Sequence, residues 1–292
     1  MASHVLPGSG KLFIVATPIG NLKDISQRAL ETLSQVELIA AEDTRHSGKL
    51  LQHYGITTSL LSLHEHNELL QAPKLIQRML SGSDMALISD AGTPLVSDPG
   101  LGLVRLAREA GIQVVPIPGA SAAITALSVA GLPSDRFCFE GFLPAKAGAR
   151  QKVLETLTAE TRSLIFYEAP HRIVATCEAM RDAFGAERRA VIARELTKRF
   201  ETIHDASLAE LCDWLQSDEN QRKGEFVLIV HGAAAADTHE LDDATRHMIQ
   251  ILLEELPLKQ AVALAAEITH VRKNTLYRRA LELAGEKRTS NS

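Results

Sequence analysis

The chain has 292 residues, 45% hydrophobic and 23% charged, and these proportions exclude a disordered chain, a collagen and a long coiled coil. Its apolar runs are shorter than the ~20 residues that a membrane-spanning helix needs, and residues 1–10 lack the pattern of a secretion signal. We therefore expect a cytoplasmic protein of two or three domains without a membrane segment, and the net charge of −5 argues against a protein that coats nucleic acid along its whole surface.

Four apolar runs of strand length alternate with segments of helical periodicity in the first part of the chain. The runs cover residues 12–16, 38–41, 86–89 and 114–117. Such alternation predicts a parallel α/β domain. Between the runs, Pro73 predicts the start of one helix, and Gly111 predicts the residue that follows the end of another.

A second series has more strands for each helix. Strands are expected near residues 136–141, 164–167, 189–193, 200–204 and 226–230, with only two evident helices, at 173–184 and from 205 or 207 to 214. This ratio predicts a mixed sheet. We place a first domain at 1–125, a second at 126–235, and a linker followed by helices at 236–292.

Standard nucleotide and metal motifs are absent from the sequence. No dinucleotide fingerprint and no P-loop is present, and Cys138, Cys177 and Cys212 lie far apart, without metal-binding spacing. Residues 64–68 pack four potential ligands into a short segment. Adjacent ligands on one loop rarely converge on one ion without a distant partner, so we expect no metal site and favour a solvated or substrate-facing loop.

Three loops rich in glycine and proline each follow a predicted strand. They cover residues 15–22, 88–100 and 116–123. Open parallel sheets bind ligands at the carboxyl ends of their strands, and glycine lets the backbone approach a ligand closely. One such loop is equally consistent with ordinary turn chemistry, but three at equivalent strand ends indicate a ligand site.

Several motifs together give the chain a family resemblance. They are the segments ATPIGNL at 16–22, AEDTR at 41–45, HEHNE at 64–68, SDAGTP at 89–94, FYEAPHR at 166–172 and RELTK at 194–198. In these motifs, over about residues 11–285, the chain resembles the tetrapyrrole methylase superfamily of S-adenosylmethionine-dependent enzymes. Within that superfamily it is most similar to the branch that methylates a cytidine ribose of small-subunit (16S) ribosomal RNA at the 2′-oxygen.

The resemblance implies two α/β domains of the tetrapyrrole methylase type (class III methyltransferase), a small C-terminal helical region and a homodimer. It implies S-adenosylmethionine in the cleft between the α/β domains and, as substrate, small-subunit ribosomal RNA or the assembled small ribosomal subunit. The residues that match cofactor-binding positions are Pro18, Asp90, Ala91, Gly92, Thr93, Val96, Ser121, Ala122, Glu168 and Leu196. Two departures favour the RNA branch: many tetrapyrrole enzymes are apolar at Glu168, and their second loop reads Gly-Asp-Pro where this chain has Thr93.

Methyl transfer to a hydroxyl needs alignment and a group that takes the proton. Glu42 and Asp43, followed by Arg45, are the candidate catalytic residues, with the cation holding a phosphate. The alternative for this segment is an Asp helix cap with its salt-bridged arginine. Lys198 and Arg199 are candidate phosphate contacts, and an ordinary solvated strand end is the alternative.

The C-terminal segment is basic and helical. Residues 257–292 hold seven lysines and arginines against three glutamates. Apolar positions 258–265 and 276–283 predict two helices joined by a turn near residues 269–271, which resembles a helix-turn-helix. Its candidate RNA contacts are Arg272, Lys273, Arg278 and Arg279, and a plain helical cap is the alternative.

Two other functions remain open from the sequence. A small-molecule tetrapyrrole methylase has no need of the basic helical end, and a DNA-binding regulator has no need of about 230 residues of α/β structure with three ligand loops. Methylation of RNA accounts for both features.

Overall fold

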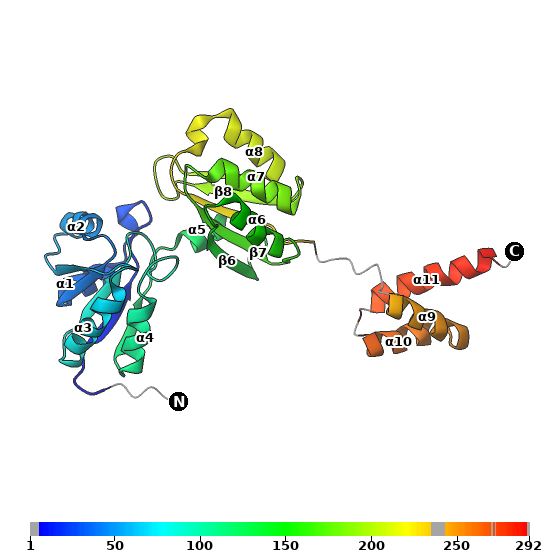
Figure 1. The fold of residues 1–292 in the computed structure, drawn as a ribbon, viewed down its shortest axis with the longest axis horizontal. Helices are drawn as coiled ribbons and strands as arrows, with labels where there is room; N and C mark the ends of the chain where they lie inside the picture. Colours follow the sequence, from blue (N-terminus) through cyan, green and yellow to red (C-terminus); the bar gives the residue numbers. More distant parts are fainter. Residues whose placement is uncertain (1–5, 235–242, 270, 272, 291–292) are drawn as a thin grey trace. The chain divides into compact units, whose positions relative to one another are not determined.

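The computed structural model describes residues 6–234, 243–269, 271 and 273–290 (Figure 1). The chain divides into two compact units, Met1–Gly232 and Ala233–Ser292. Within the described residues, no helix is both long and apolar enough to cross a membrane.

The first sheet is entirely parallel. Its strands are β1 (Lys11–Val15), β2 (Leu38–Ala41), β3 (Ser59–Ser62), β4 (Met85–Ile88) and β5 (Gln113–Ile117), in the order β3-β2-β4-β1-β5. The strands predicted at the four apolar runs are confirmed to within one residue at each end. The buried β2 and β4 explain why these runs are continuous rather than alternating, since both faces of a parallel sheet are covered.

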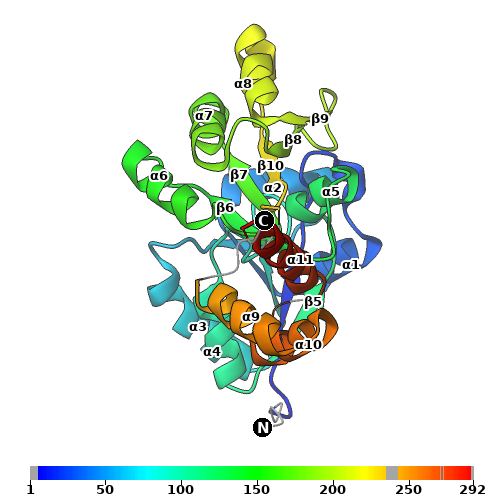
Figure 2. The ribbon, with the colours of Figure 1, turned by 90° about the vertical axis from the view of Figure 1, so that its right-hand side faces the viewer.

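Helices cover both faces of this sheet. Side chains of α3 (Glu68–Leu80) and α4 (Leu101–Glu109) pack on one face, and those of α1 (Gln27–Gln35) and α2 (Thr44–His53) pack on the other. The helices α3 and α4 lie side by side in both ribbon views (Figures 1 and 2). Gly111 follows the end of α4 with a φ of 71°, as predicted.

The helix start predicted at Pro73 is wrong. Helix α3 begins at Glu68, so Pro73 lies inside it. The error has a physical reason: Ala72 is buried together with Leu75 and Met79, so burial of this helix face supports the helix on both sides of Pro73 although the proline cannot donate a backbone hydrogen bond.

The second sheet is mixed, as predicted. Its strands are β6 (Phe137–Phe142), β7 (Ser163–Glu168), β8 (Arg189–Arg194), β9 (Thr202–Ser207) and β10 (Phe226–Val230), in the order β6-β7-β10-β8-β9. Only β6 and β7 are parallel, and β10 is antiparallel to both β7 and β8. The start of β10 therefore lies at the same edge as the ends of β7 and β8.

Four α-helices accompany this sheet. Helix α5 (Ala122–Val129) packs on one face, whereas α6 (Ala147–Thr156), α7 (Ile173–Phe184) and α8 (Leu208–Ser217) pack on the other. The expectation of only two helices among these strands missed α6. Of its ten residues only Arg150 and Leu154 are buried, so the segment has no extended apolar stripe.

The C-terminal unit is a helical bundle. It contains α9 (Asp243–Glu255), α10 (Leu258–Thr269) and α11 (Lys273–Ser290), orange to red in Figure 1. Its core joins Ile249 to the predicted stripes of α10 and α11, including Val262, Ala265, Leu276 and Ala280. The apolar positions predicted from periodicity therefore form a core of their own.

Candidate cofactor and active site

The three predicted ligand loops follow three neighbouring strands. In the first sheet β1 lies between β4 and β5, so the loops after these strands meet at one edge. Thr17 and Gly92 exchange two backbone hydrogen bonds, of 2.8 and 3.1 Å, between the first and second loops. The Thr93 hydroxyl donates to the Ala120 carbonyl at 3.0 Å and joins the second loop to the third.

Gly92 stands where the second loop pairs with the first. Its φ is +83°, and a Cβ there would lie 3.3 Å from Ile19 Cγ2. Both the backbone conformation and the space favour glycine.

Two segments at this site have strained backbones. Leu95 and Ser97 have φ values of 72° and 65°, and Glu195 and Thr197 have values of 51° and 65°. Non-glycine residues rarely adopt positive φ, and such strain persists where the surrounding structure enforces it, often at functional sites. The residue between the two members of each pair, Val96 or Leu196, lines a cavity at this site.

This cavity has a volume of about 420 Å³, a size suited to a nucleoside-sized ligand. Residues of both sheets line it, and they are Ile19, Asp90, Ala91, Gly92, Thr93, Val96, Ser97, Asp98, Ser121, Ala122, Phe142, Tyr167, Glu168, Ala169, Pro170, Ala193, Leu196, Glu225, Phe226 and Val227. All the predicted cofactor residues except Pro18 are in this set. Pro18 is buried next to Ile19, which lines the cavity.

The charged side chains around the cavity have one sign. The charged lining residues are Asp90, Asp98, Glu168 and Glu225, and no lysine or arginine is among the lining residues. Two of the four are neutralised by neighbours, since Glu168 pairs with Arg172 and Glu225 with Lys198. Among the described residues, the ion pairs include neither Asp90 nor Asp98. The cavity therefore favours a cationic ligand.

The Glu168 carboxylate serves the fold rather than the cavity. It accepts hydrogen bonds from the Thr176 hydroxyl at 2.6 Å and from the backbone of Ala169 at 2.8 Å, and it pairs with Arg172. Successive side chains of a strand point to opposite faces, so the preceding Tyr167 lies on the α5 side, where its hydroxyl accepts from the Ala123 amide at 3.1 Å.

Asp43 and Arg45, predicted as catalytic residues, form the helix cap with a salt-bridged arginine that was the alternative interpretation. Asp43 is the N-cap of α2, and its carboxylate accepts from the Arg45 backbone at 2.8 Å and from the Arg45 guanidinium. These bonds lower the pKa of Asp43 to about 2, and the Arg45 side chain is 90% exposed. Neither residue lines the cavity.

Glu42 lies closer to the cavity carboxylates. Burial, followed by the charges of Asp90 and Asp98, raises its pKa. The Asp43 amide donates to Asp90 Oδ1 at 3.1 Å and ties the end of β2 to the loop after β4. Asp98 itself is half-buried, and burial together with the charge of Asp90 raises its pKa to about 6, against a hydrogen bond from Ser89.

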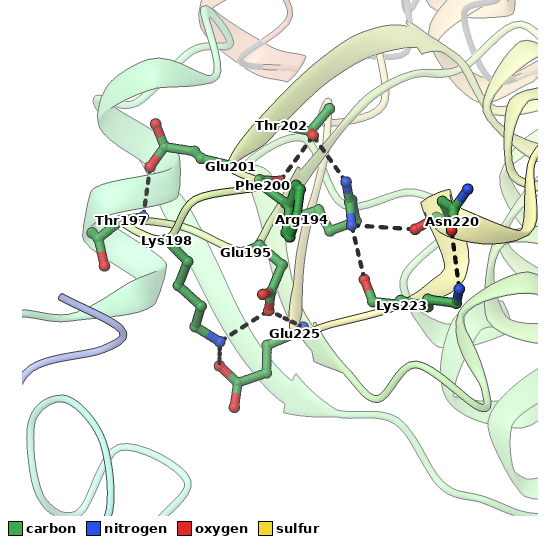
Figure 3. Close-up of polar contacts among 10 residues, drawn as sticks. All are labelled: Arg194, Glu195, Thr197, Lys198, Phe200, Glu201, Thr202, Asn220, Lys223 and Glu225. Carbon is green, nitrogen blue, oxygen red and sulfur yellow. Dashed lines mark hydrogen bonds and ion pairs between the residues drawn. The ribbon is translucent and has the colours of Figure 1, made fainter.

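Lys198 is held by two carboxylates (Figure 3). Its ammonium lies 2.9 Å from Glu195 Oε1 and 2.7 Å from Glu225 Oε2. A Cβ on Gly20 would lie 2.6 Å from Lys198 Cγ, so the lysine stem packs against the first loop. The Lys198 ammonium is thus bound by carboxylates of this chain, while Arg199 is exposed and its guanidinium lies 5.6 Å from the Phe200 ring centroid.

The segment 64–68 is a turn that leads into the first residue of α3. Glu68 accepts from the Leu103 amide at 2.8 Å and from the Gly100 amide at 3.4 Å, and so caps the start of α4, where Gly100 has no side chain to do so. Asn67 binds the backbone of His64 and Ser62. In the part of the chain that the structure describes, no group of three or more His, Cys, Asp or Glu side chains could hold a metal ion.

The predicted RNA contacts at the C-terminus lie in or next to α11. Arg272 falls outside the described residues. Lys273 begins α11 and is exposed, and Arg278 and Arg279 follow within this 18-residue helix.

Sequence reasoning identified Glu168 in the second sheet but missed other cavity residues of that sheet, and it missed Asp98. Phe142, Ala193 and Phe226 come from separate strands, and only the mixed topology brings the ends of β6 and β8 to the start of β10. Asp98 lies in the second ligand loop, and a carboxylate in a glycine-rich loop after a strand was the available signal.

The comparisons with known proteins agree with this architecture. Residues 11–212 match the family described as Tetrapyrrole (Corrin/Porphyrin) Methylases, and residues 239–284 match the RsmI C-terminal HTH domain. In solved structures, the fold resembles uroporphyrin-III C-methyltransferase from Thermus thermophilus (TM-score 0.54, 20% identity, 76% of this chain and 94% of that one) and diphthine synthase (TM-score 0.57, 18% identity, 76% and 90%). The chain belongs to the tetrapyrrole methylase family, and the two α/β domains and helical end predicted from sequence are confirmed.

Curated relatives narrow the family further. The chain is 59% identical to ribosomal RNA small subunit methyltransferase I of Pseudomonas aeruginosa over 95% of this chain and 99% of the relative, and 58% identical to that of Escherichia coli over 94% and 96%. Identity to the protein of the same name in Mesorhizobium japonicum is 50%, over 93% and 92%. Within the tetrapyrrole methylases, the chain belongs to the ribosomal RNA small subunit methyltransferase I family.

Proposed function

We propose that this chain transfers a methyl group from S-adenosylmethionine to the 2′-oxygen of a cytidine ribose in small-subunit ribosomal RNA. The main observation in favour of this cofactor is the acidic cavity, whose carboxylates Asp90 and Asp98 have no ion-pair partner among the described residues. S-adenosylmethionine has a sulfonium and an ammonium against one carboxylate, so its net charge complements this lining.

The residues present fit such a ligand. Gly92, with no Cβ, gives a ligand access to the backbone of the second loop, and Ser121 offers a hydroxyl at the start of α5. Phe142 and Phe226 supply apolar surface from the second sheet, and Leu196 is held by the strained segment between Glu195 and Thr197. When bound, the cofactor supplies an electrophilic methyl carbon.

The choice of RNA rests on the relatives and on the chain's own C-terminus. The relatives' name states that they act on small-subunit ribosomal RNA. The basic segment 257–292 suits a phosphate backbone, which rewards lysine and arginine through counterion release. The cytidine ribose as methyl acceptor comes from the resemblance in the motifs. The proposal also includes the cytoplasm as the site of reaction and assigns Lys273, Arg278 and Arg279 to RNA contacts.

The proposal is tested with small ribosomal subunits from a strain that lacks this protein. Purified protein and cofactor labelled in the methyl group are incubated with the subunits, with free ribosomal RNA and with a tetrapyrrole acceptor. We expect label in the ribosomal RNA, on a cytidine whose 3′-phosphodiester becomes resistant to alkali, because a 2′-O-methyl group removes the nucleophile of that cleavage. Label on a base, or on the tetrapyrrole alone, contradicts the proposal.

A further inference from the structure

Phe200 exposes 64% of its surface, the largest fraction among the phenylalanine, tyrosine and tryptophan residues that the structure describes. It lies near the end of the segment 195–201, which joins β8 to β9. The guanidinium of the exposed Arg199 lies over the Phe200 ring, 5.6 Å from its centroid. Phe200 and Arg199 therefore present a flat aromatic surface with a positive charge beside it, the combination that binds the bases and phosphates of single-stranded nucleic acids.

The segment that carries Phe200 is held in one conformation (Figure 3). The Glu201 carboxylate accepts a hydrogen bond from the Thr197 amide at 2.6 Å, and the Glu201 amide donates to the Lys198 carbonyl at 3.2 Å. The Lys198 amide donates in turn to the Glu195 carbonyl at 3.0 Å. A side chain on a backbone fixed in this way has less conformational entropy to lose when a ligand binds to it, which favours binding.

The buried Arg194 ties the Phe200 backbone to the second sheet (Figure 3). Its guanidinium donates to the carbonyls of Asn220 and Lys223 at 3.2 and 3.1 Å, and to the hydroxyl oxygen of Thr202 at 3.2 Å. The Thr202 hydroxyl donates to the Phe200 carbonyl at 3.1 Å. The Phe200 backbone is therefore held by contacts with the sheet, while its ring contributes little to the hydrophobic core of that sheet.

The same segment reaches the cavity. Leu196 lines the cavity, and so does Glu225, which binds the Lys198 ammonium at 2.7 Å. Leu196 and Phe200 are four residues apart, so their Cα atoms lie at most ~14 Å from each other. Nucleotides of one strand in a nucleic acid helix follow each other at ~3.4 Å along the axis, so about four of them span this distance. An RNA strand with one ribose at the cavity therefore has a nearby base within reach of Phe200.

We propose that Phe200 and Arg199 form an RNA-binding site beside the cavity, where a base close to the methylated nucleotide stacks on the Phe200 ring and the Arg199 guanidinium contacts a phosphate. Every base has a face that stacks on an aromatic ring, so the site holds the strand without selecting its sequence. Phe200 positions the substrate and touches neither the cofactor nor the reacting atoms. This inference rests on the proposed function and adds a substrate contact to it.

The charges around Phe200 favour RNA over a second copy of the chain. Among the described residues, the ion pairs do not include Arg199, so its charge is available to a phosphate. A two-fold contact between copies brings the same surface patch of both chains together. If the Phe200 ring lay at the centre of such a contact, the two Arg199 side chains would face and repel each other.

The test compares Phe200→Ala, Phe200→Leu, Phe200→Trp and Arg199→Gln with the wild type. The kcat/KM for small ribosomal subunits from a strain that lacks this protein is measured at several salt concentrations, with S-adenosylmethionine saturating for each variant. Calorimetry gives the affinity for the cofactor, and light scattering gives the mass in solution. Phe137→Ala is the matched control, because Phe137 is also exposed, at 39%, and does not line the cavity.

We expect Phe200→Ala to lower kcat/KM for the subunits by roughly 5- to 100-fold, the usual effect of losing one stacked base. Phe200→Trp should keep the wild-type value because its ring also stacks, whereas Phe200→Leu should lose most of it because an apolar side chain without a ring does not. Arg199→Gln should lower the slope of the salt dependence by ~0.7, the value for one single-strand phosphate contact. Affinity for the cofactor should stay at the wild-type value in all four variants, since neither residue lines the cavity, and Phe137→Ala should match the wild type in every measurement.

Three results would overturn this site. A kcat/KM within about twofold of the wild type in both Phe200→Ala and Phe200→Leu would exclude stacking. Affinity for the cofactor that falls roughly tenfold or more in Phe200→Ala would show that the ring supports the cavity wall instead. A single-chain mass for Phe200→Ala beside a dimeric wild type would assign the ring to a contact between copies. A wild-type protein that labels no ribosomal RNA would overturn the proposed function itself, so the two failures are distinguishable.

Discussion

Gly92 combines a left-handed backbone with a position between two loops. An added methyl group costs about 1 kcal/mol or more at such a φ, and here it also lies against Ile19. We expect Gly92→Ala to weaken S-adenosylmethionine binding by roughly tenfold or more, because the second loop must move where it pairs with Thr17. Calorimetry on the purified variant measures the loss.

Gly55 provides the matched control for Gly92. Its φ is +69°, and nothing lies within 4 Å of an added Cβ. Gly55→Ala should therefore share the backbone cost in thermal unfolding and keep full affinity for the cofactor. Equal affinities in Gly92→Ala and the wild type would refute the placement of the ligand at this loop.

The raised pKa of Asp98 makes the stability of the folded protein depend on pH. Its folded pKa of about 6 exceeds the ordinary 3.8, so the folded state binds its proton more tightly than the unfolded state does. The contribution of this group to stability is full below pH 3.8 and is lost as pH rises through 6. Asp98→Asn does not titrate, so its thermal midpoint relative to the wild type should increase from pH 4 to pH 6.5 and then stay level. Melting curves across this range, in the absence of RNA, check the sign; a flat difference would contradict it.

At the scale of elements, Glu68, the first residue of α3, caps the start of α4. Glu68→Ala leaves two amides of that helix start without their acceptor, and we expect it to lower the free energy of unfolding by about 1 to 2 kcal/mol. Denaturant unfolding measures the change. Glu65→Ala, an exposed position in the same segment, should change little, and an equal loss in both variants would show that the cap contributes nothing specific.

The sequence predicted those elements whose own residues determine them. The buried runs of β2 and β4 and the stripe of α7 could be read directly, because burial on both faces or on one stripe leaves a local pattern. Helix α6 leaves no such pattern, since it buries only Arg150 and Leu154. Pro73 misled because burial of one face of α3 maintains the helix through a residue that cannot donate a backbone hydrogen bond.

Site residues could be predicted from the sequence where neighbouring residues determine their position, and not where strand pairing brings distant residues together. The loop residues Gly92 and Ser121 could be identified because glycine and proline patterns follow strands directly. The cavity positions from β8 and β10 depend on an antiparallel pairing of residues 32 to 40 positions apart, and no local pattern encodes it. The Glu168 carboxylate is bound by Arg172 and Thr176 at the start of α7, and these contacts could not be predicted from the motif around Glu168.

For the whole molecule, the basic C-terminal segment offers a test of RNA binding. Replacing Arg272, Lys273, Arg278 and Arg279 together by Gln should weaken RNA binding and flatten its salt dependence, with a slope lower by ~0.7 for each lost single-strand phosphate contact. Affinity for the cofactor should stay unchanged, because the cavity lining lies within residues 19–227. An unchanged salt slope would favour a plain helical cap.

The homodimer expected from the resemblance is a prediction about assembly. Light scattering at micromolar concentration should give twice the mass of one chain, at every salt concentration used for RNA binding. A single-chain mass would contradict it. The variant with four Gln residues should keep the wild-type mass if those side chains serve RNA rather than the dimer contact.

The central place of β10 has a consequence for synthesis of the chain. The first sheet has all its strands once residue 117 has been made, whereas the second lacks its middle strand until residue 230. At a translation rate of roughly 5 to 20 residues per second, β7 and β8 are synthesised seconds before β10, the strand that pairs with both. During that interval the edges of β7 and β8 that later pair with β10 have no partner strand, and the apolar residues that β10 helps to bury lack part of their cover. A ribosome that stalls before Phe226 therefore carries a finished first sheet and an aggregation-prone half of the second.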